Sequence, residues 1–339
     1  MSRCQCRCVG CQGLVRREER YRMDVHRPVE LAVWGLPEPS RVRRPAGGTN
    51  NTTLILDDTH VLRIYQNLLP AEIAAEHRLL NELNQRGGLP FTVPAPRPTL
   101  DGRTVHDSMA IFPFVPGQRA DESLESIELA AEALGVLDQA LAEVAVELAP
   151  RDWRGSLEQI HPGVSDLEGA CAELERRLGD GPGLRWFRES IGPAERLHAK
   201  LVRTLPVQIV HGDYSLWNVL VHEGRVSAVL DFEVAHLGLR LNDPVAAVTM
   251  ATGLGISGAE ERLAAFLRGY ARSASLSAAE EEATPAMLRY KALYSVVWRI
   301  GRWRLGLSPI EEITERLADG LVLDKWLARS GWPGWAWAA

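Results

Sequence analysis

The chain has 339 residues, of which 46% are hydrophobic and 24% charged, enough for a large buried core and more than one lobe. Its formal net charge of −6 argues against nucleic acid as the main partner, because binding a polyanion requires an excess of positive charge. The sequence has no apolar run of about 18 residues and no apolar signal-peptide core at its start. We therefore expect no membrane span, no membrane partner and a cytoplasmic location.

The first residues are rich in cysteine and arginine. Four of the five cysteines stand here, at Cys4, Cys6, Cys8 and Cys11, without the long central spacer of a zinc finger. We predict that residues 1–29 form a disordered tail; alternatively, translation starts at Met23. A third hypothesis, a metal-handling protein built on these thiols, predicts that deletion of residues 1–22 abolishes function.

A small sheet with one helix is predicted next, over residues 30–116. The polar segment Ala46–Thr53 precedes an apolar run, Leu54–Leu56, and a turn then leads into a second strand, Val61–Tyr65. Apolar residues at helical spacing predict a helix over Ala71–Gln85, which Gly87-Gly88 ends. Met109–Gly117 is typical of a buried strand that runs into a linker.

Residues 117–330 are predicted to form a mainly helical lobe, followed by a tryptophan-rich tail over 331–339. Amphipathic periodicity predicts helices over Leu124–Leu148 and Leu167–Leu178. Glu195–Thr204 leads into the strand Val207–Val210, and further helices are expected over Ala259–Ala271, Pro285–Leu305 and Pro309–Ala328. Together the two parts give an α+β fold with a small antiparallel-sheet lobe and a helical lobe.

The most informative stretch is His211-Gly212-Asp213-Tyr214-Ser215-Leu216-Trp217-Asn218, followed by Asp231-Phe232. The apolar residues Val207–Val210 predict a strand that delivers Asp213. A strand, a turn at Gly224 and a second strand then separate Asn218 from Asp231. Phosphoryl transfer from Mg-ATP uses such groups: a carboxylate that accepts a hydroxyl proton and two oxygen ligands for Mg²⁺. Alternatively, the His211–Asn218 stretch is an ordinary turn and Asp231-Phe232 an ordinary strand end, without catalytic meaning. This alternative could explain either motif alone, but it explains less well why the two occur together in this order.

These motifs resemble the catalytic and metal loops of the aminoglycoside phosphotransferase family, which includes choline kinases and homoserine-kinase-like enzymes and shares the protein-kinase fold. The family has His-Gly-Asp where protein kinases have His-Arg-Asp. The resemblance implies that Asp213 is the catalytic base, that Asn218 and Asp231 bind Mg²⁺, and that His211 supports the loop. Glu233 replaces the glycine of the protein-kinase metal motif, as in several members of the homoserine-kinase-like branch.

The resemblance also implies an ATP site in the first lobe. A phosphate-binding loop is expected at Gly47, Gly48, Thr49 and Asn50, whose amides and side chains can donate hydrogen bonds. Arg63 stands where the family carries Lys or Arg for the phosphates. None of the three lysines lies in the first half of the chain, which leaves Arg63 as the candidate for this role. Glu76, or failing it Glu72, is expected to pair with Arg63. The adenine hinge is expected at Phe112, Pro113, Phe114 and Val115.

Asp243 has two compatible interpretations. In the family, an Asp near a helix start braces the catalytic loop; Asp243 followed by Pro244 also matches an N-terminal helix cap.

The acceptor is left open by the sequence, beyond a small molecule with a hydroxyl group. Arg299, Arg302 and Arg304 suit a substrate carboxylate, whereas the Glu280-Glu281-Glu282 run, one possible partner for a polycation, is more typical of a solvated face. The main hypothesis is a kinase for a homoserine, amino-alcohol or sugar-like acceptor. The alternatives are an aminoglycoside or macrolide kinase and a nucleotide-binding regulatory pseudokinase. Protein substrates are disfavoured, since no Ala-Pro-Glu element follows Asp231.

Overall fold

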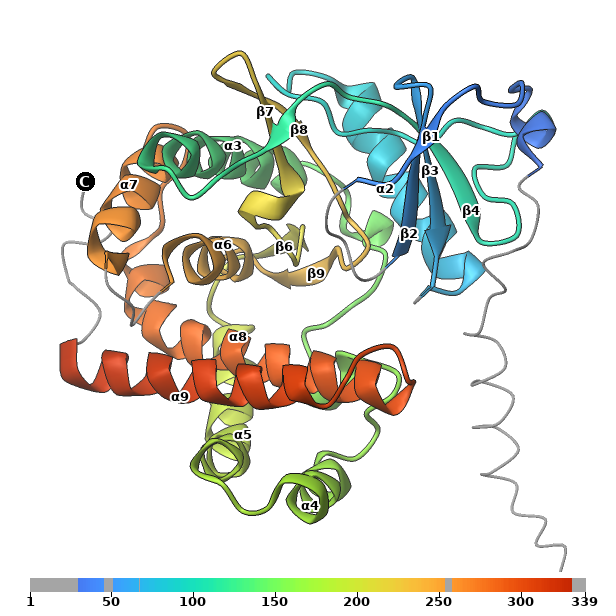
Figure 1. Ribbon diagram of the computed structural model, residues 1–339. Coiled ribbons are helices and arrows are strands. Elements are labelled where there is room, and N and C mark those ends of the chain that lie inside the picture. Colours follow the sequence, from blue (N-terminus) through green and yellow to red (C-terminus); the bar gives the residue numbers. More distant parts are fainter. Residues whose placement is uncertain (1–29, 46–50, 67, 254–257, 331–339) are drawn as a thin grey trace, which may run out of the picture. The chain divides into compact units, whose positions relative to one another are not determined.

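The computed structural model describes residues 30–45, 51–66, 68–253 and 258–330 (Figure 1). The predictions for the two termini and for Gly47, Gly48, Thr49 and Asn50 lie outside the described residues. The chain forms two compact units. The first comprises the residues up to Ala74 together with Pro96–Phe114; the second comprises Ala75–Ala95 and the chain from Val115 onward.

The first unit is built on a four-stranded antiparallel sheet in the order β1-β2-β3-β4. Its elements are a 3-10 helix η1 (Leu31–Trp34), β1 (Val42–Arg43), β2 (Asn51–Leu56), β3 (His60–Tyr65), β4 (Met109–Pro113) and the start of α2 (Pro70–Arg86). The predicted β2–β3 hairpin is present, with Thr53 opposite Arg63. The core of the first unit is a cluster of apolar side chains from the strands and η1: Leu31, Trp34, Leu56, Leu62, Met109 and Ile111.

The second unit is mainly helical and contains two small sheets. Its helices are α3 (Leu124–Ala142), α4 (Leu167–Leu178), α5 (Pro182–Leu201), α6 (Asn242–Thr252), α7 (Ala259–Ala271), α8 (Ala278–Arg304) and α9 (Glu311–Ser330), with 3-10 helices η2 (Val146–Leu148), η3 (Leu157–Gln159) and η4 (Leu216–Asn218). Its strands are β5 (Gln118–Arg119), β6 (Val207–Val210), β7 (Val219–His222), β8 (Arg225–Val229) and β9 (His236–Leu239).

Both small sheets position the catalytic motif. Strand β6 pairs antiparallel with β9, and the β7–β8 hairpin pairs with β5 through β7. Residues 75–95 join this unit through the backbone: the Thr92 amide donates to Ser227 O at 2.9 Å, and the Val229 amide donates to Thr92 O at 3.0 Å. The segments that leave β6 and β8, which carry the motif residues, therefore start from hydrogen-bonded strands.

The start of α8 differs from the prediction. Pro285 suggested a helix start, but the helix begins seven residues earlier (285 − 278), because Ser277 and Glu280 form a capping box. The Glu280 side chain is fully buried and pairs with Arg240 at 2.9 and 2.5 Å. The expectation that the Glu280–Glu282 run is a solvated face is therefore wrong for Glu280.

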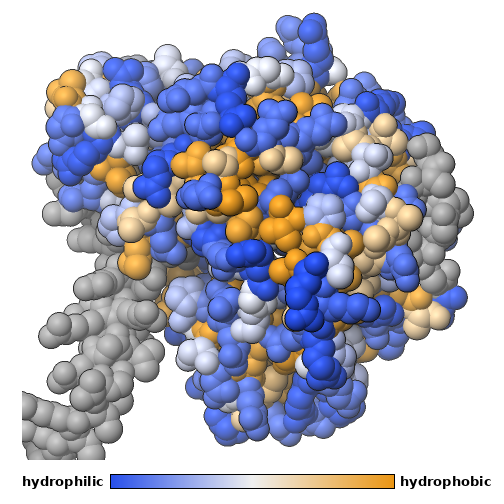
Figure 2. All heavy atoms as spheres, turned by 180° about the vertical axis from the view of Figure 1, so that it is seen from behind, coloured by the Kyte–Doolittle hydropathy of each residue, from blue (hydrophilic) through white to orange (hydrophobic). Residues whose placement is uncertain are grey.

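The surface carries mostly hydrophilic residues on the face drawn in Figure 2, with hydrophobic residues in smaller groups between them. Among the described helices, none has the length and apolar character needed to cross a membrane.

Candidate active site

The backbone of His211 and Gly212 is held by one carboxylate. The Asp243 side chain accepts hydrogen bonds from the His211 amide at 2.6 Å and from the Gly212 amide at 2.7 Å. Gly212 has φ +84°, and a Cβ there would lie 2.5 Å from Val234 O. The loop therefore requires glycine at this position, both for its left-handed conformation and for the close approach of the chain around Val234.

Asp243 does not cap its helix. Helix α6 begins at Asn242, so Asp243 is its second residue and not its N-cap. The cap interpretation is therefore wrong in this detail: both carboxylate oxygens already accept from the loop, 31 and 32 residues earlier. Burial raises the pKa of Asp243, while His211 and the two amide hydrogen bonds act in the opposite direction.

His211 joins the loop before Asp213 to the segment before Asp231. Its Nδ1 accepts from the Asp213 amide at 3.3 Å, so its Nε2 carries the hydrogen and donates to Leu230 O at 2.9 Å. The ring is fully buried and lies 4.5 Å from the Phe232 ring. His211 therefore fixes the two halves of the motif to each other.

Asn218 and Asp231 stand at the two ends of the β7–β8 hairpin. The Leu230 amide donates to Asn218 O at 2.8 Å. The Asn218 Nδ2 donates to Asp213 O at 2.9 Å, which leaves Asn218 Oδ1 as an oxygen acceptor. Asp231 has φ +68°, a strained conformation for a residue with a side chain.

The donor set at Asn218 and Asp231 suits magnesium. Mg²⁺ is commonly held by one or two protein oxygens together with substrate phosphates and water. Within the described residues, no group of three or more His, Cys, Asp or Glu side chains is placed to hold a metal ion.

Asp213 is exposed to solvent, but the protein atoms around its carboxylate partly remove that group from water. This burial raises the pKa of Asp213; Lys291 lowers it, and the Asp231 charge raises it. The Asp213 carboxylate thus senses both a cation and a second carboxylate, an electrostatic environment typical of a proton acceptor.

Lys291 is a site residue to which the sequence assigned no role. It lies on α8, and its Nζ donates to Gly212 O at 2.8 Å, with the Tyr294 ring centroid 4.2 Å away. Burial lowers the pKa of Lys291, whereas Asp213 and Asp243 raise it. Its 79-residue separation from Gly212 left no local pattern that would have revealed the contact.

The arginines considered for a substrate carboxylate are engaged within the protein. Arg299 pairs with Glu312 at 2.8 Å, and Arg304 pairs with Glu173 at 2.9 Å. The buried Arg302 donates from Nη2 to Leu307 O at 3.1 Å. Their contacts favour a structural role for these three side chains.

The nucleotide-site residues predicted in the first half of the chain are divided between the units. In the first unit, Arg63 on β3 lies with its guanidinium carbon 4.9 Å from the Tyr65 ring centroid. Phe112 and Pro113 are the last residues of β4, and the amide of the next residue, Phe114, donates to Thr59 O at 2.9 Å. In the second unit, Glu76 is fully buried on α2, and Val115 is the first residue after Phe114. The Arg63–Glu76 pairing and the adenine hinge stay predictions.

Comparison with known proteins identifies the family. A family model described as "Phosphotransferase enzyme family" matches residues 41–279, which include every motif residue described above. The protein belongs to this family of phosphotransferases. The predicted family and the predicted α+β, protein-kinase-like fold class are thus confirmed, and the chain is a small-molecule phosphotransferase.

The similar proteins act on different acceptors. A homoserine kinase of Caulobacter vibrioides is 26% identical over 322 residues, covering 88% of this chain and 92% of that protein. A structure of the amicoumacin kinase hAmiN with AMP-PNP, Ca²⁺ and Ami has a TM-score of 0.64 at 16% identity, covering 91% of this chain and 96% of that one. A microcompartment-associated aminopropanol kinase has a TM-score of 0.60 at 18% identity, covering 94% and 99%.

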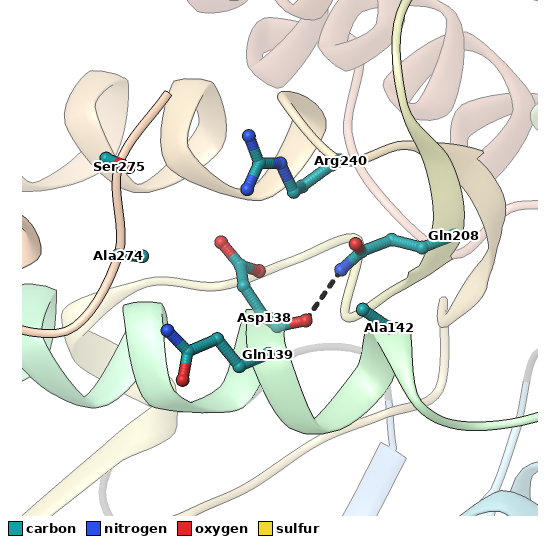
Figure 3. Close-up of a pocket in the computed structure, with 7 residues that line it drawn as sticks. All are labelled: Asp138, Gln139, Ala142, Gln208, Arg240, Ala274 and Ser275. Atoms are coloured by element: carbon teal, nitrogen blue, oxygen red, sulfur yellow. Dashed lines mark hydrogen bonds between the residues drawn. The ribbon is translucent and has the colours of Figure 1, made fainter. Parts of the chain in front are cut away.

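The phosphotransferase also contains a small polar pocket of about 190 Å³ (Figure 3). Asp138 and Arg240 face each other across it, and the Gln208 side-chain Nε2 donates to the Asp138 backbone carbonyl at 2.9 Å. The Asp138 carboxylate accepts from Tyr270 at 2.8 Å, while its Oδ1 has no hydrogen-bond partner among the described residues. Glu280 already neutralises Arg240, so an ionised Asp138 would be a surplus buried negative charge. Burial and the charge of Asp243 accordingly raise the pKa of Asp138 well above its usual range.

The raised pKa of Asp138 predicts a pH-dependent effect of Asp138→Asn on stability. The wild type gains stability from protonated Asp138 below the unfolded-state pKa, about 3.9, and loses this gain as the pH rises through the folded-state pKa. Asparagine stays neutral, can still accept from Tyr270, and can offer its NH₂ to water in the pocket. We expect the two proteins to melt alike near pH 4 and the variant to melt a few degrees higher at pH 8. A variant that melts lower at pH 8 would contradict this assignment; melting curves from pH 4 to 8 provide the measurement.

Proposed function

We propose that the protein transfers the γ-phosphoryl group of ATP to a hydroxyl group of a small molecule. The observation that carries this proposal is the backbone linkage of Asp213, Asn218 and Asp231: the Asn218 side chain bonds to the Asp213 carbonyl, and the Leu230 amide, next to Asp231, bonds to the Asn218 carbonyl. Asp213 would orient the acceptor hydroxyl and take its proton. Asn218 and Asp231 would hold Mg²⁺, which when bound neutralises charge on the phosphates.

The proposed reaction balances without a further reactant. The acceptor oxygen forms a bond to the γ-phosphorus, and the bond from that phosphorus to the bridging oxygen of ATP breaks. ADP leaves with the electron pair, and the acceptor proton passes to Asp213. Arg63 would contact the phosphates with Glu76 as its partner, the segment from Gly47 to Asn50 would cover them, and Phe112 to Val115 would receive the adenine.

For the acceptor, we propose a small amino alcohol. The homoserine kinase and the aminopropanol kinase share this chemistry in their names and cover nearly the whole chain. The amicoumacin kinase favours a second candidate, phosphorylation of an antibiotic. A regulatory pseudokinase is a weaker third candidate, since Asp213, Asn218 and Asp231 are all present.

The proposal is tested by ADP release from Mg-ATP against a panel of acceptors. The panel contains homoserine, aminopropanol, choline, amino sugars, aminoglycosides and macrolides, with Asp213→Asn as the inactive control. Turnover of homoserine or aminopropanol supports the amino-alcohol proposal, whereas turnover of only an antibiotic replaces it with the second candidate. Magnesium-dependent ATP binding without any turnover would favour the regulatory role, and absence of ATP binding would overturn the proposal.

A further inference from the structure

The two peptide planes that flank the Asp213 Cα are both held by side chains. The plane before Asp213 consists of Gly212 C=O and Asp213 N–H: Lys291 Nζ donates to the carbonyl at 2.8 Å, and His211 Nδ1 accepts from the amide at 3.3 Å. The plane after it is held at the Asp213 carbonyl by Asn218 Nδ2 at 2.9 Å. Because both planes are fixed, the direction of the Asp213 Cα–Cβ bond is fixed, and with it the region that the carboxylate can reach.

Of the three side chains that hold these planes, His211 and Asn218 belong to the catalytic motif itself, whereas Lys291 lies far from it in sequence. It comes from the middle of α8, in which Leu288, Leu293 and Val296 are buried. The Lys291 ammonium group senses the carboxylates of Asp213 and Asp243, and its Nζ lies 4.2 Å from the centroid of the Tyr294 ring. Burying a Lys side chain is costly unless its charge is compensated, and here two carboxylates of the site and a loop carbonyl compensate it.

We propose that Lys291 is a positioning residue for phosphoryl transfer: its ammonium group holds the peptide plane before Asp213 and thereby aims the carboxylate at the acceptor hydroxyl. This inference rests on the proposed function of Asp213. The bond from Lys291 adds what Asp243 does not provide. Asp243 accepts from the Gly212 amide, which belongs to the peptide plane between His211 and Gly212, whereas Lys291 donates to the Gly212 carbonyl of the next plane.

The primary test compares Lys291→Met with the wild type in two measurements. In the acceptor assay, we expect kcat to fall by about 100-fold, the scale of a misplaced catalytic group, with the KM for ATP and for the acceptor within about twofold of wild type. In hydrogen exchange followed by mass spectrometry, we expect faster exchange in peptides that cover residues 211–213 and unchanged exchange in α7. Lys325→Met on α9, at an exposed position, is the matched control and should behave as wild type.

A second variant separates positioning from a packing defect. Lys291→Cys should lose activity as Lys291→Met does, and aminoethylation of the new thiol, which rebuilds a cation of nearly the same length, should restore at least about one-tenth of the wild-type kcat. Wild type treated in parallel controls for modification of its own cysteines. Restored kcat is a response that a purely structural lysine would not give.

The outcomes distinguish this inference from the proposed function. Unchanged exchange at residues 211–213 in Lys291→Met overturns the positioning role whether or not an acceptor is found. A kcat within about threefold of wild type also overturns it, as does failure of aminoethylation to restore activity to a folded Lys291→Cys. Faster exchange at residues 211–213 in a protein whose wild type binds ATP but phosphorylates nothing supports the contact and rejects the proposed function instead.

Discussion

Replacement of Asp213 by asparagine is expected to lower kcat by about 10²- to 10⁴-fold, the usual contribution of a positioned acid or base. Asparagine has almost the same shape, and the backbone hydrogen bonds from Asn218 and Lys291 do not involve the replaced atoms. The variant should therefore fold normally and lose only the group that takes the acceptor proton. Steady-state ADP release, measured with saturating acceptor, provides the value of kcat.

Two controls define this result. The dissociation constant of ATP for Asp213→Asn, measured by calorimetry with Mg²⁺, should stay within about threefold of wild type. The reason is that the base is expected to stabilise the transition state and not to bind ATP in the ground state. Asp319→Asn changes an exposed carboxylate on α9 and should leave kcat unchanged. If Asp213→Asn kept more than about one-tenth of the wild-type kcat, Asp213 would not be the catalytic base.

Replacement of Asp243 by alanine should destabilise the protein and inactivate it together. The fully buried Asp243 accepts from two buried amides, His211 and Gly212, and each unsatisfied group costs about 1–3 kcal/mol. We expect the free energy of unfolding to fall by about 2–5 kcal/mol and kcat to fall by about 100-fold, since the loop loses its brace. Urea unfolding and the acceptor assay measure the two effects.

Asp243→Asn gives a sharper form of the same prediction. Its carboxamide has one oxygen, so one of the two amides would face an NH₂ group, and donor would meet donor. This nearly isosteric change should therefore cost a large share of the alanine effect. Asn242→Ala, one residue earlier on α6, is the control and should leave kcat within about threefold of wild type. Equal stability of Asp243→Asn and wild type at neutral pH would contradict the brace.

The sequence predicted elements well where the signal was local. Strand β6 and helices α4 and α7 have the predicted bounds, since their apolar period and their end residues lie within the elements themselves. Strand β9 was not predicted; it is four residues long and is defined by pairing with β6, a partner that is distant in sequence. The start of α8 was displaced because a proline was given more weight than the Ser277–Glu280 capping box.

The same distinction applies to the site. His211, Asp213, Asn218 and Asp231 are close in sequence, and their order alone suggested a hairpin that brings them together. The contact from Lys291 and the burial of Glu280 depend on how α8 packs, which a single sequence does not specify. For Asp243, the family resemblance implied a brace on the catalytic loop, and its side chain accepts from two amides of that loop, 31 and 32 residues earlier; its neighbours in sequence had also suggested a helix cap.

The crowding around Gly212 has a consequence for how such a loop can change during evolution. Protein kinases carry Arg at the corresponding place in their motif, but a Cβ at position 212 would meet Val234 O at 2.5 Å and the His236 ring at 3.0 Å. The single substitution Gly212→Arg, which would convert His-Gly-Asp into His-Arg-Asp, is therefore not tolerated in this loop by itself. A change at position 212 requires the segment around Val234 and His236 to move with it, so the two loops are constrained to vary as a pair.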